Sequence, residues 1–166
     1  MKNSDIRDCI IGGLNEYMGG ECPFLLSTTA EPKKEYPYGT YTITNPRLEP
    51  VRPAMYEEES EDKLKRTYET IIEQVYSFTI IGNEEDQVQD LTHKAINFFR
   101  IYGIKQLSHN NIVVVEVSNV QNRDSFVTIE YEKRVGFDVR FRMVEISEYE
   151  DVEYIGATNL NVEEEV

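Results

Sequence analysis

Residues 126–146, FVTIEYEKRVGFDVRFRMVEI, alternate apolar and polar side chains along almost their whole length. Eight of the nine odd-numbered positions in 127–143 are apolar, and the even-numbered positions between them are mostly charged. A period of two predicts a strand with one buried face and one face in solvent. The alternation keeps its parity through Gly136, so we expect one continuous strand from Phe126 to Ile146, without a hairpin or a bulge.

The length of this strand is unusual. At about 3.3 Å per residue, residues 127–143 would span roughly 55 Å, whereas most strands have about 5–6 residues. A strand this long extends beyond the body of its own domain. We therefore expect its end to lie in a ring, in a neighbouring subunit or in the wall of a tube.

The composition is that of one folded domain. The 166 residues are 40% hydrophobic and 11% aromatic, with 11 Tyr, 7 Phe and no Trp, which favours a β-rich core. No apolar run is long enough to span a membrane, and the start, MKNSDIRD, has no apolar signal region. Cys9 and Cys22 are too few for a disulfide framework and lack further ligands at metal-site spacing.

The net charge of −14 comes from two segments. Residues 57–62 hold five acids and residues 145–166 hold eight, and neither segment contains Lys or Arg. The rest of the chain has 18 acids against 17 bases and is nearly neutral. This argues against a nucleic-acid-binding protein, which needs a basic stripe, and against a DNA mimic, whose acids would cover a structured face. Solvated loops that keep the protein soluble are the simplest interpretation.

Helix and strand patterns alternate along the chain. Apolar residues at three- and four-residue steps predict a helix over 4–18, capped by Ser4, with Cys9 on its apolar face. A second helix, capped by Asn83, extends to Tyr102. The remaining expected strands are 23–27, 38–45 (ended by Pro46), 64–81 and 112–120, with turns at 108–111 and 122–124. Residues 47–63 have no clear periodicity and predict a protruding acidic loop, with strand extensions as an alternative.

These elements predict an α+β fold, in which two helices cover one face of an antiparallel sheet with unusually long strands. No nucleophile lies beside a base, and no glycine-rich phosphate loop is present. Glu130 and Asp138 lie on the polar strand face beside arginines, which indicates cross-strand charge pairing. His93 and His109 lack partners at ligand spacing, so we expect neither a metal site nor a catalytic site, and no cofactor.

Four blocks of the sequence, in order, resemble the bacteriophage neck or tail-terminator (head–tail joining) family. They are PYGTYTI at 37–43, SFTIIG at 77–82, NRD at 122–124 and YEKRVGFDVRFR at 131–142. The similarity covers roughly residues 4–145. The acidic insertion and the Glu-rich end of the chain depart from the family pattern. We therefore expect a single tail-terminator-like domain over 1–147 and an acidic C-terminal tail over 148–166.

The resemblance implies a structural virion protein without enzymatic activity or cofactor. Such proteins assemble as a ring, typically a homohexamer, between the head connector or adaptor and the tail tube. The ring ends tail polymerisation and joins the tail to the head. We accordingly expect assembly in the host cytoplasm, DNA that passes through the lumen without specific binding, and no membrane partner.

Two groups of residues are candidate subunit contacts. Arg134, Arg140 and Arg142 lie on the charged face of the long strand, and we expect them to pair with acids across subunits. In the acidic tail, Tyr154 and Ile155 are apolar side chains that could dock on the same subunit or the next one.

Other functions are compatible with parts of the sequence. The nearest is a different neck component, such as a head-completion adaptor or a tail tube subunit. An acidic inhibitor that mimics DNA and a hydrolase that uses Cys9 or His93 belong to other classes. Unchanged assembly of a Cys9→Ala variant would exclude a thiol enzyme.

Overall fold

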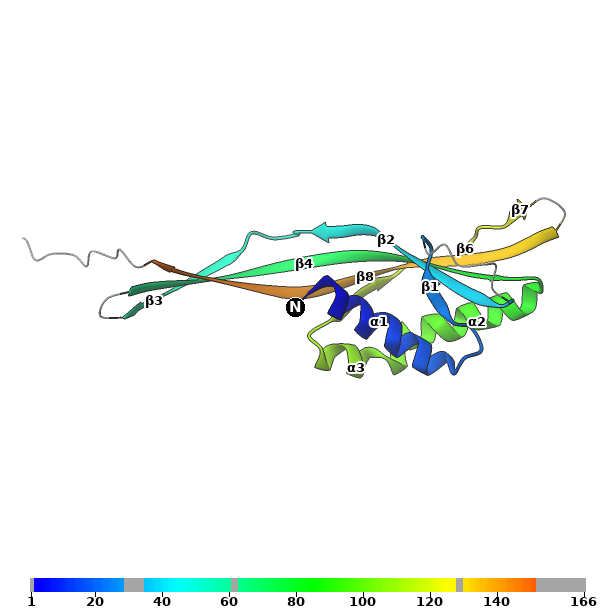
Figure 1. Cartoon of the computed structure of the whole chain (residues 1–166), viewed down its shortest axis with the longest axis horizontal. Helices are drawn as coiled ribbons and strands as arrows, with labels where there is room; N and C mark the ends of the chain where they lie inside the picture. Colours follow the sequence, from blue (N-terminus) through cyan, green and yellow to red (C-terminus); the bar gives the residue numbers. More distant parts are fainter. Residues whose placement is uncertain (1, 29–34, 61–62, 128–129, 152–166) are drawn as a thin grey trace, which may run out of the picture.

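Two very long strands form the axis of the computed structural model, which describes residues 2–28, 35–60, 63–127 and 130–151. Strand β4 (Lys63–Gly82) pairs antiparallel with β8 (Glu130–Asp151) without a register shift, from Leu64 opposite Asp151 to Gly82 opposite Lys133. Both strands extend beyond the helical body, so the molecule is elongated (Figure 1). The expectation of strands that exceed the size of one domain is confirmed.

The long strand starts later than the sequence analysis expects. Ser125–Val127 forms a separate strand, β7, which folds back and pairs antiparallel with residues 130–132 of β8. Residues 128–129 lie outside the described residues. The expectation of one continuous strand from Phe126 is therefore wrong, because both sides of a hairpin continue a period of two. At the other end, β8 continues past Ile146 to Asp151.

The other strands line up along the two sides of this pair. Strands β2 (Tyr38–Leu48) and β3 (Ala54–Ser60) follow one another along β4, and β5 (Val113–Val117) and β6 (Gln121–Asn122) lie along β8. The short strand β1 (Phe24–Leu26) is parallel to β2, whereas every other pairing is antiparallel among the described strands. The fold is thus α+β with a mostly antiparallel sheet.

Two strand limits differ from the expected ones. Pro46 does not end β2, which continues to Leu48 through register shifts on both sides of Asn45. Such irregularities accommodate a residue without an N–H group. Residues 54–60, expected in a loop, form β3, which pairs with β4. In this ladder Glu57 lies opposite Arg66 and Glu58 opposite Lys65, so the bases that follow the acidic run compensate it in part.

The helices cover one face of the sheet, as expected (Figure 1). They are α1 (Asn3–Met18), α2 (Glu85–Asn97), the π-helical turn η1 (Phe98–Tyr102) and α3 (Ile104–His109). Three expected details are wrong. The N-cap of α1 is Lys2, and Ser4 lies inside the helix. The N-cap of α2 is Glu84 and not Asn83. His109 is the last residue of α3 instead of lying in a turn. Among the described residues, no helix is long and apolar enough to cross a membrane.

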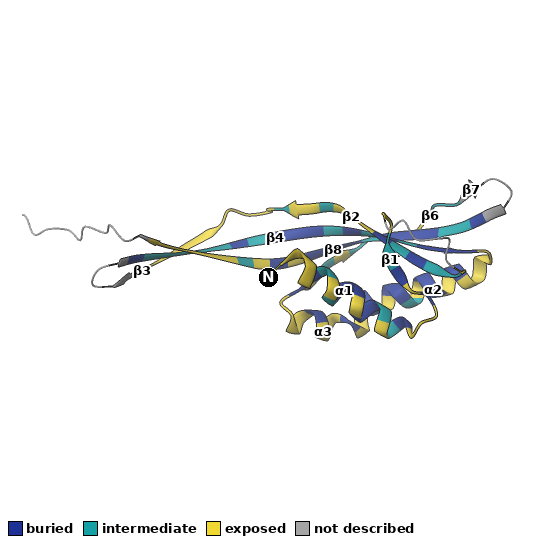
Figure 2. Cartoon of the chain, in the orientation of Figure 1, coloured by how far each residue is buried: buried dark blue, intermediate teal, exposed yellow. Residues whose placement is uncertain are grey.

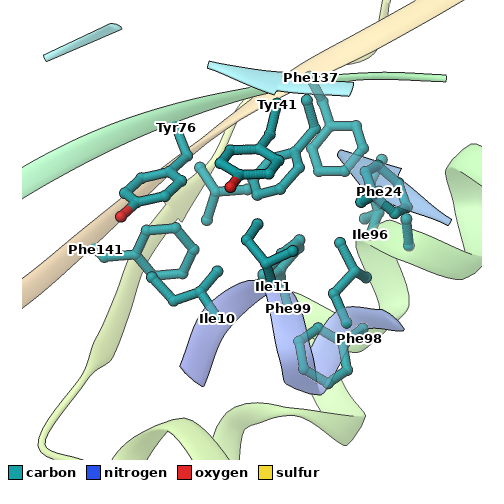
Figure 3. Close-up of a cluster of buried hydrophobic side chains, with 14 of the residues drawn as sticks. Ile10, Ile11, Phe24, Tyr41, Tyr76, Ile96, Phe98, Phe99, Phe137 and Phe141 are labelled. Carbon is teal, nitrogen blue, oxygen red and sulfur yellow. The ribbon is translucent and has the colours of Figure 1, made fainter. Parts of the chain in front are cut away.

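Aromatic rings fill the space between the sheet and the helices (Figure 3). Phe78 lies at the centre, with ring centroids 5.1 Å from Phe99 and 5.4 Å from Phe137. Its ring also meets Phe24 edge to face at 5.8 Å, and Cβ of an alanine at Gly39 would lie only 2.4 Å from the Phe24 ring. Burial raises the pKa of the Tyr76 hydroxyl to about 12. The core therefore depends on aromatic packing across β1, β4, β8 and η1.

Burial decreases toward the end of the sheet that carries β3 (Figure 2). We use the word arm for residues 54–60 of β3, 63–71 of β4 and 144–151 of β8. No described helix covers the arm (Figure 1). Its side chains therefore contribute to solubility and contacts more than to the core.

The central ring should dominate the stability of the protomer. We expect Phe78→Ala, which removes a fully buried ring, to lower the free energy of unfolding by about 3–5 kcal/mol. Tyr56→Ala on the arm, where the side chain is 54% exposed, should change it by less than about 0.5 kcal/mol. Urea unfolding followed by circular dichroism measures both. Equal losses would contradict the central role of Phe78.

Candidate assembly surface

The sheet face opposite the helices is uncovered and polar. The β4–β8 register places Glu73, Ser77 and Thr79 of β4 on this face, opposite Arg142, Asp138 and Gly136 of β8 respectively. Side chains at directly opposed positions share one face of a sheet. All four blocks that resemble the neck family contribute to this face, since Thr40 and Thr42 of β2 lie opposite Thr79 and Ser77. It is therefore a candidate surface for function.

Arg123 lies flat on this face, above Gly136. Its Nη1 donates hydrogen bonds to Ser77 Oγ at 2.8 Å and Thr79 Oγ1 at 3.1 Å, and its Nη2 donates to Asp138 Oδ1 at 3.2 Å. A Cβ atom at position 136 would lie 2.6 Å from Arg123 Nη1. The glycine therefore makes room for the guanidinium group, which connects β4 and β8 to the turn after β6.

Asp124 fixes the same turn to β8. Its Oδ1 accepts a hydrogen bond from the backbone N–H of Arg134 at 2.8 Å, and its own N–H donates to Asn122 Oδ1 at 2.8 Å. The backbone N–H of Arg123 donates to the Arg134 carbonyl oxygen at 2.7 Å. The hydrogen bond from Arg134 is the main cause that lowers the pKa of the Asp124 carboxyl. The three-residue turn is thus an anchor that holds Arg123 in place.

A buried carboxylate lies farther along the same face. Glu73 is 3% exposed although no described helix covers it. Arg142 donates two hydrogen bonds to Glu73 Oε1, at 2.9 Å from Nε and 2.7 Å from Nη2, and Arg140 Nη1 lies 3.8 Å from Glu73 Oε2. Arg140 also pairs with Glu116 at 2.7 Å. The arginines shield the carboxylate from water and link β4, β8 and β5.

Ion pairs also connect the strands of the arm and its base. Arg66 pairs with Glu57 at 2.9 Å, and Lys65 pairs with Glu148 at 3.0 Å. At the base of the arm, Arg47 donates to Glu145 at 2.8 Å, and this hydrogen bond is the main cause that lowers the pKa of Glu145. The negative charge of Glu57, Glu145 and Glu148 is therefore compensated within the protomer, in part of the two acidic segments.

The predicted contact residues have partners within their own chain. Arg140 and Arg142 hold Glu73, and Arg134 Nη2 pairs with Glu132 at 2.7 Å. Their pairing across subunits stays a prediction. Tyr154 and Ile155 lie outside the described residues.

Few features of the described residues suggest catalysis or metal binding. No group of three or more His, Cys, Asp or Glu side chains there could hold a metal ion. Burial raises the pKa of both thiols, to about 12 for Cys22, so at neutral pH Cys22 is a protonated core residue rather than a nucleophile. His93 is exposed on α2. Asp138, which the sequence placed in charge pairing, pairs with Arg123 at 3.2 Å.

Sequence reasoning misses Arg123, because the sequence shows it only as part of a turn at 122–124. A glycine inside a regular strand pattern signals a close approach by another group. Gly136 therefore indicates a close approach, but the sequence does not show which residue approaches it.

The fold and this surface define a class: a one-sided α+β protein with an uncovered charged sheet face and an arm that extends beyond its core. The chain belongs to the phage neck terminator protein family, whose family model matches residues 6–165. A search of curated proteins finds no match. The family is structural, so the chain is a bacteriophage neck component that interacts with other head–tail proteins of the virion.

The Arg123–Gly136 contact can be tested with a double-mutant cycle. We expect Gly136→Ala to lower the free energy of unfolding by about 1–2 kcal/mol, because the new methyl group displaces the guanidinium from its three acceptors. In an Arg123→Ala background, the same change should be neutral or stabilise the protein by up to about 1 kcal/mol. Equal losses in both backgrounds, measured by urea unfolding, would contradict the contact.

The anchor at Asp124 predicts a specific pH dependence. An ordinary Asp titrates near pH 3.9, and the pKa of Asp124 is lower than this in the folded chain. Its stabilising effect is therefore complete above about pH 4 and is lost as the pH falls through the folded-state value. We expect Asp124→Asn to flatten the dependence of the unfolding free energy on pH below pH 4. A pH dependence of Asp124→Asn that parallels the wild type would contradict the anchor.

Proposed function

We propose that the chain assembles into a ring at the phage neck, which ends polymerisation of the tail tube and joins the tail to the head connector. The observation that carries the proposal is the arm, together with the family membership. Strands β4 and β8, of 20 and 22 residues, extend beyond the helical body, where β3 pairs with β4 to complete a three-stranded arm. A domain that works alone gains little from such an extension, whereas a ring subunit can use it to reach its neighbours.

Open strand edges support this proposal. On its outer side, β8 pairs with β5 only as far as Arg142, so residues 143–151 face no other described strand on that side. The outer edge of β3 likewise faces no other described strand. Unpaired backbone N–H and C=O groups on an edge can pair with a strand of another chain. A contact of this kind, repeated around an axis, closes a ring.

The charged face provides a second candidate contact between subunits. Arg140 and Arg142 keep 40% and 46% of their side chains exposed while they hold Glu73. The exposed parts could pair with acids of a neighbouring subunit, as the sequence analysis predicts. Substitution of Arg140 is a poor test of assembly, because loss of either arginine would also leave Glu73 buried with less compensation. Changes on the arm separate assembly from folding more cleanly.

Purified protein mixed with growing tail tubes provides the test. We expect negative-stain images to show a ring on one end of each tube, with tube lengths that no longer increase. Tubes that keep growing with bare ends would contradict the proposal. A protein that instead incorporates along the whole tube would identify a tube subunit, and one that binds only the head connector would identify a head-completion adaptor.

Two truncations separate the arm from the acidic tail. A chain that ends after Asp151 keeps all of β8, whereas a chain that ends after Ser147 also loses Lys65's partner Glu148 and the last ladder pairs of the arm. We expect the truncation after Ser147 to stay folded by circular dichroism but to cap fewer tubes. Capping by the chain that ends at Asp151 then reports on the tail alone. Normal capping by both chains would show that neither segment contributes.

A further inference from the structure

One long stretch of this acidic chain carries no acids. Between Asp90 and Glu116 the chain contains no Asp or Glu, although it has 31 of them in total. The same stretch contains Lys94, Arg100 and Lys105. It covers most of α2 together with η1 and α3, on the side of the molecule that carries the helices (Figure 1). Lys94 pairs with Glu21 at 2.7 Å, so the remaining positive charge of this stretch belongs to Arg100 and Lys105.

Large apolar side chains are exposed in the same region. Ile101 is 62% exposed, Tyr102 is 64% exposed and Ile104 is 47% exposed. Arg100 and Lys105 flank them and are exposed, and neither forms an ion pair with a described residue. We call these five residues the basic patch. Adjacent exposed apolar side chains with unpaired cations beside them are typical of a contact surface for a partner that is both apolar and acidic.

The arm has the complementary character. Its three segments contain eight acids and three bases. On the face opposite the helices, Tyr56, Val144 and Ile146 are 54%, 51% and 60% exposed. The ladder places Glu58 and Glu148 on this same face, on either side of Lys65. We call these five residues the acidic arm face.

The two surfaces cannot meet within one chain. The arm points away from the helices along the sheet axis, and its tip lies well beyond α1 and α3 (Figure 1). Strands β4 and β8 run without a break from the core into the arm, so the arm has no hinge that would let it fold back. Any contact between the surfaces must therefore join two molecules.

We propose that the acidic arm face of one copy docks on the basic patch of the next copy. This inference rests on the proposed ring and names the contact that would build it. The two surfaces are different, so each copy offers one of each, and the contact is head to tail. It would also bring two chains of net charge −14 together where opposite charges meet, which limits the repulsion between like-charged subunits.

Charge reversal tests the contact directly. We expect Arg100→Glu with Lys105→Glu to raise the dissociation constant of the assembly about tenfold or more, as measured by analytical ultracentrifugation. Lys2→Glu at the N-cap of α1 with Arg7→Glu inside the helix changes the net charge by the same amount and should leave assembly close to wild type. Equal effects of the two double variants, with folding intact by circular dichroism, would overturn the proposal.

A mixing experiment tests the head-to-tail geometry. Glu58→Lys with Glu148→Lys gives a second variant, in which the arm face is basic. The patch variant (Arg100→Glu with Lys105→Glu) and the arm variant should each stay monomeric alone, because the arm and the patch of each then carry the same sign of charge. A 1:1 mixture should assemble with alternating copies, since an acidic arm then meets a basic patch and a basic arm meets an acidic patch. Failure of the mixture to assemble, with both variants folded, would overturn the proposal.

These outcomes are distinct from failure of the proposed function. If the mixture assembles as expected but the wild-type ring does not cap tail tubes, the contact stands and the role at the tail end is wrong. If the wild type caps tubes and the patch variant does so equally well, the role stands and the contact is wrong. A wild-type chain that stays monomeric both alone and on tubes would overturn both.

Discussion

The uninterrupted ladder between β4 and β8 is the constraint on which the rest of the structure depends. It fixes which side chains share a face over its whole length. The aromatic core, the ion pairs of Glu73 with Arg140 and Arg142, and the arm therefore all follow from one register. A shift of β4 by one residue relative to β8 would move Phe78 to the polar face and bring Glu73 into the core. The helices cover only the part of this ladder away from β3, which leaves one face and the β3 end of the ladder uncovered (Figure 2).

The sequence predicted this framework because two-residue periodicity is a local signal. It identified β4 almost to the residue, most of β8, the class of fold and the placement of the helices on one side. It failed where two structures produce the same local pattern. The reversal between β7 and β8 preserves the alternation, and Pro46 usually ends a strand but here lies between two register shifts. Position-by-position reasoning could not distinguish these cases.

The surface was less predictable, because it depends on which distant residues meet. The arginines of β8 were visible in the sequence, but their partner Glu73 looked like an ordinary residue of another strand. Arg123 and Gly136 are thirteen residues apart, and only the path of the chain after β6 brings them together. The acidic run at 57–59 looked unstructured when considered alone. Its negative charge is compensated in part by the bases at 63–66, which only the pairing of β3 with β4 brings opposite it.

The orientation of the β4–β8 hydrogen bonds has a mechanical consequence for a protein at a joint of the virion. These bonds run perpendicular to the strands, so a pull along the sheet axis that separates β4 from β8 loads them in shear. Many bonds then share the tension and must break together, whereas peeling from one end would break them in sequence. A subunit held at its body and pulled by its arm is therefore stiffest along its long axis.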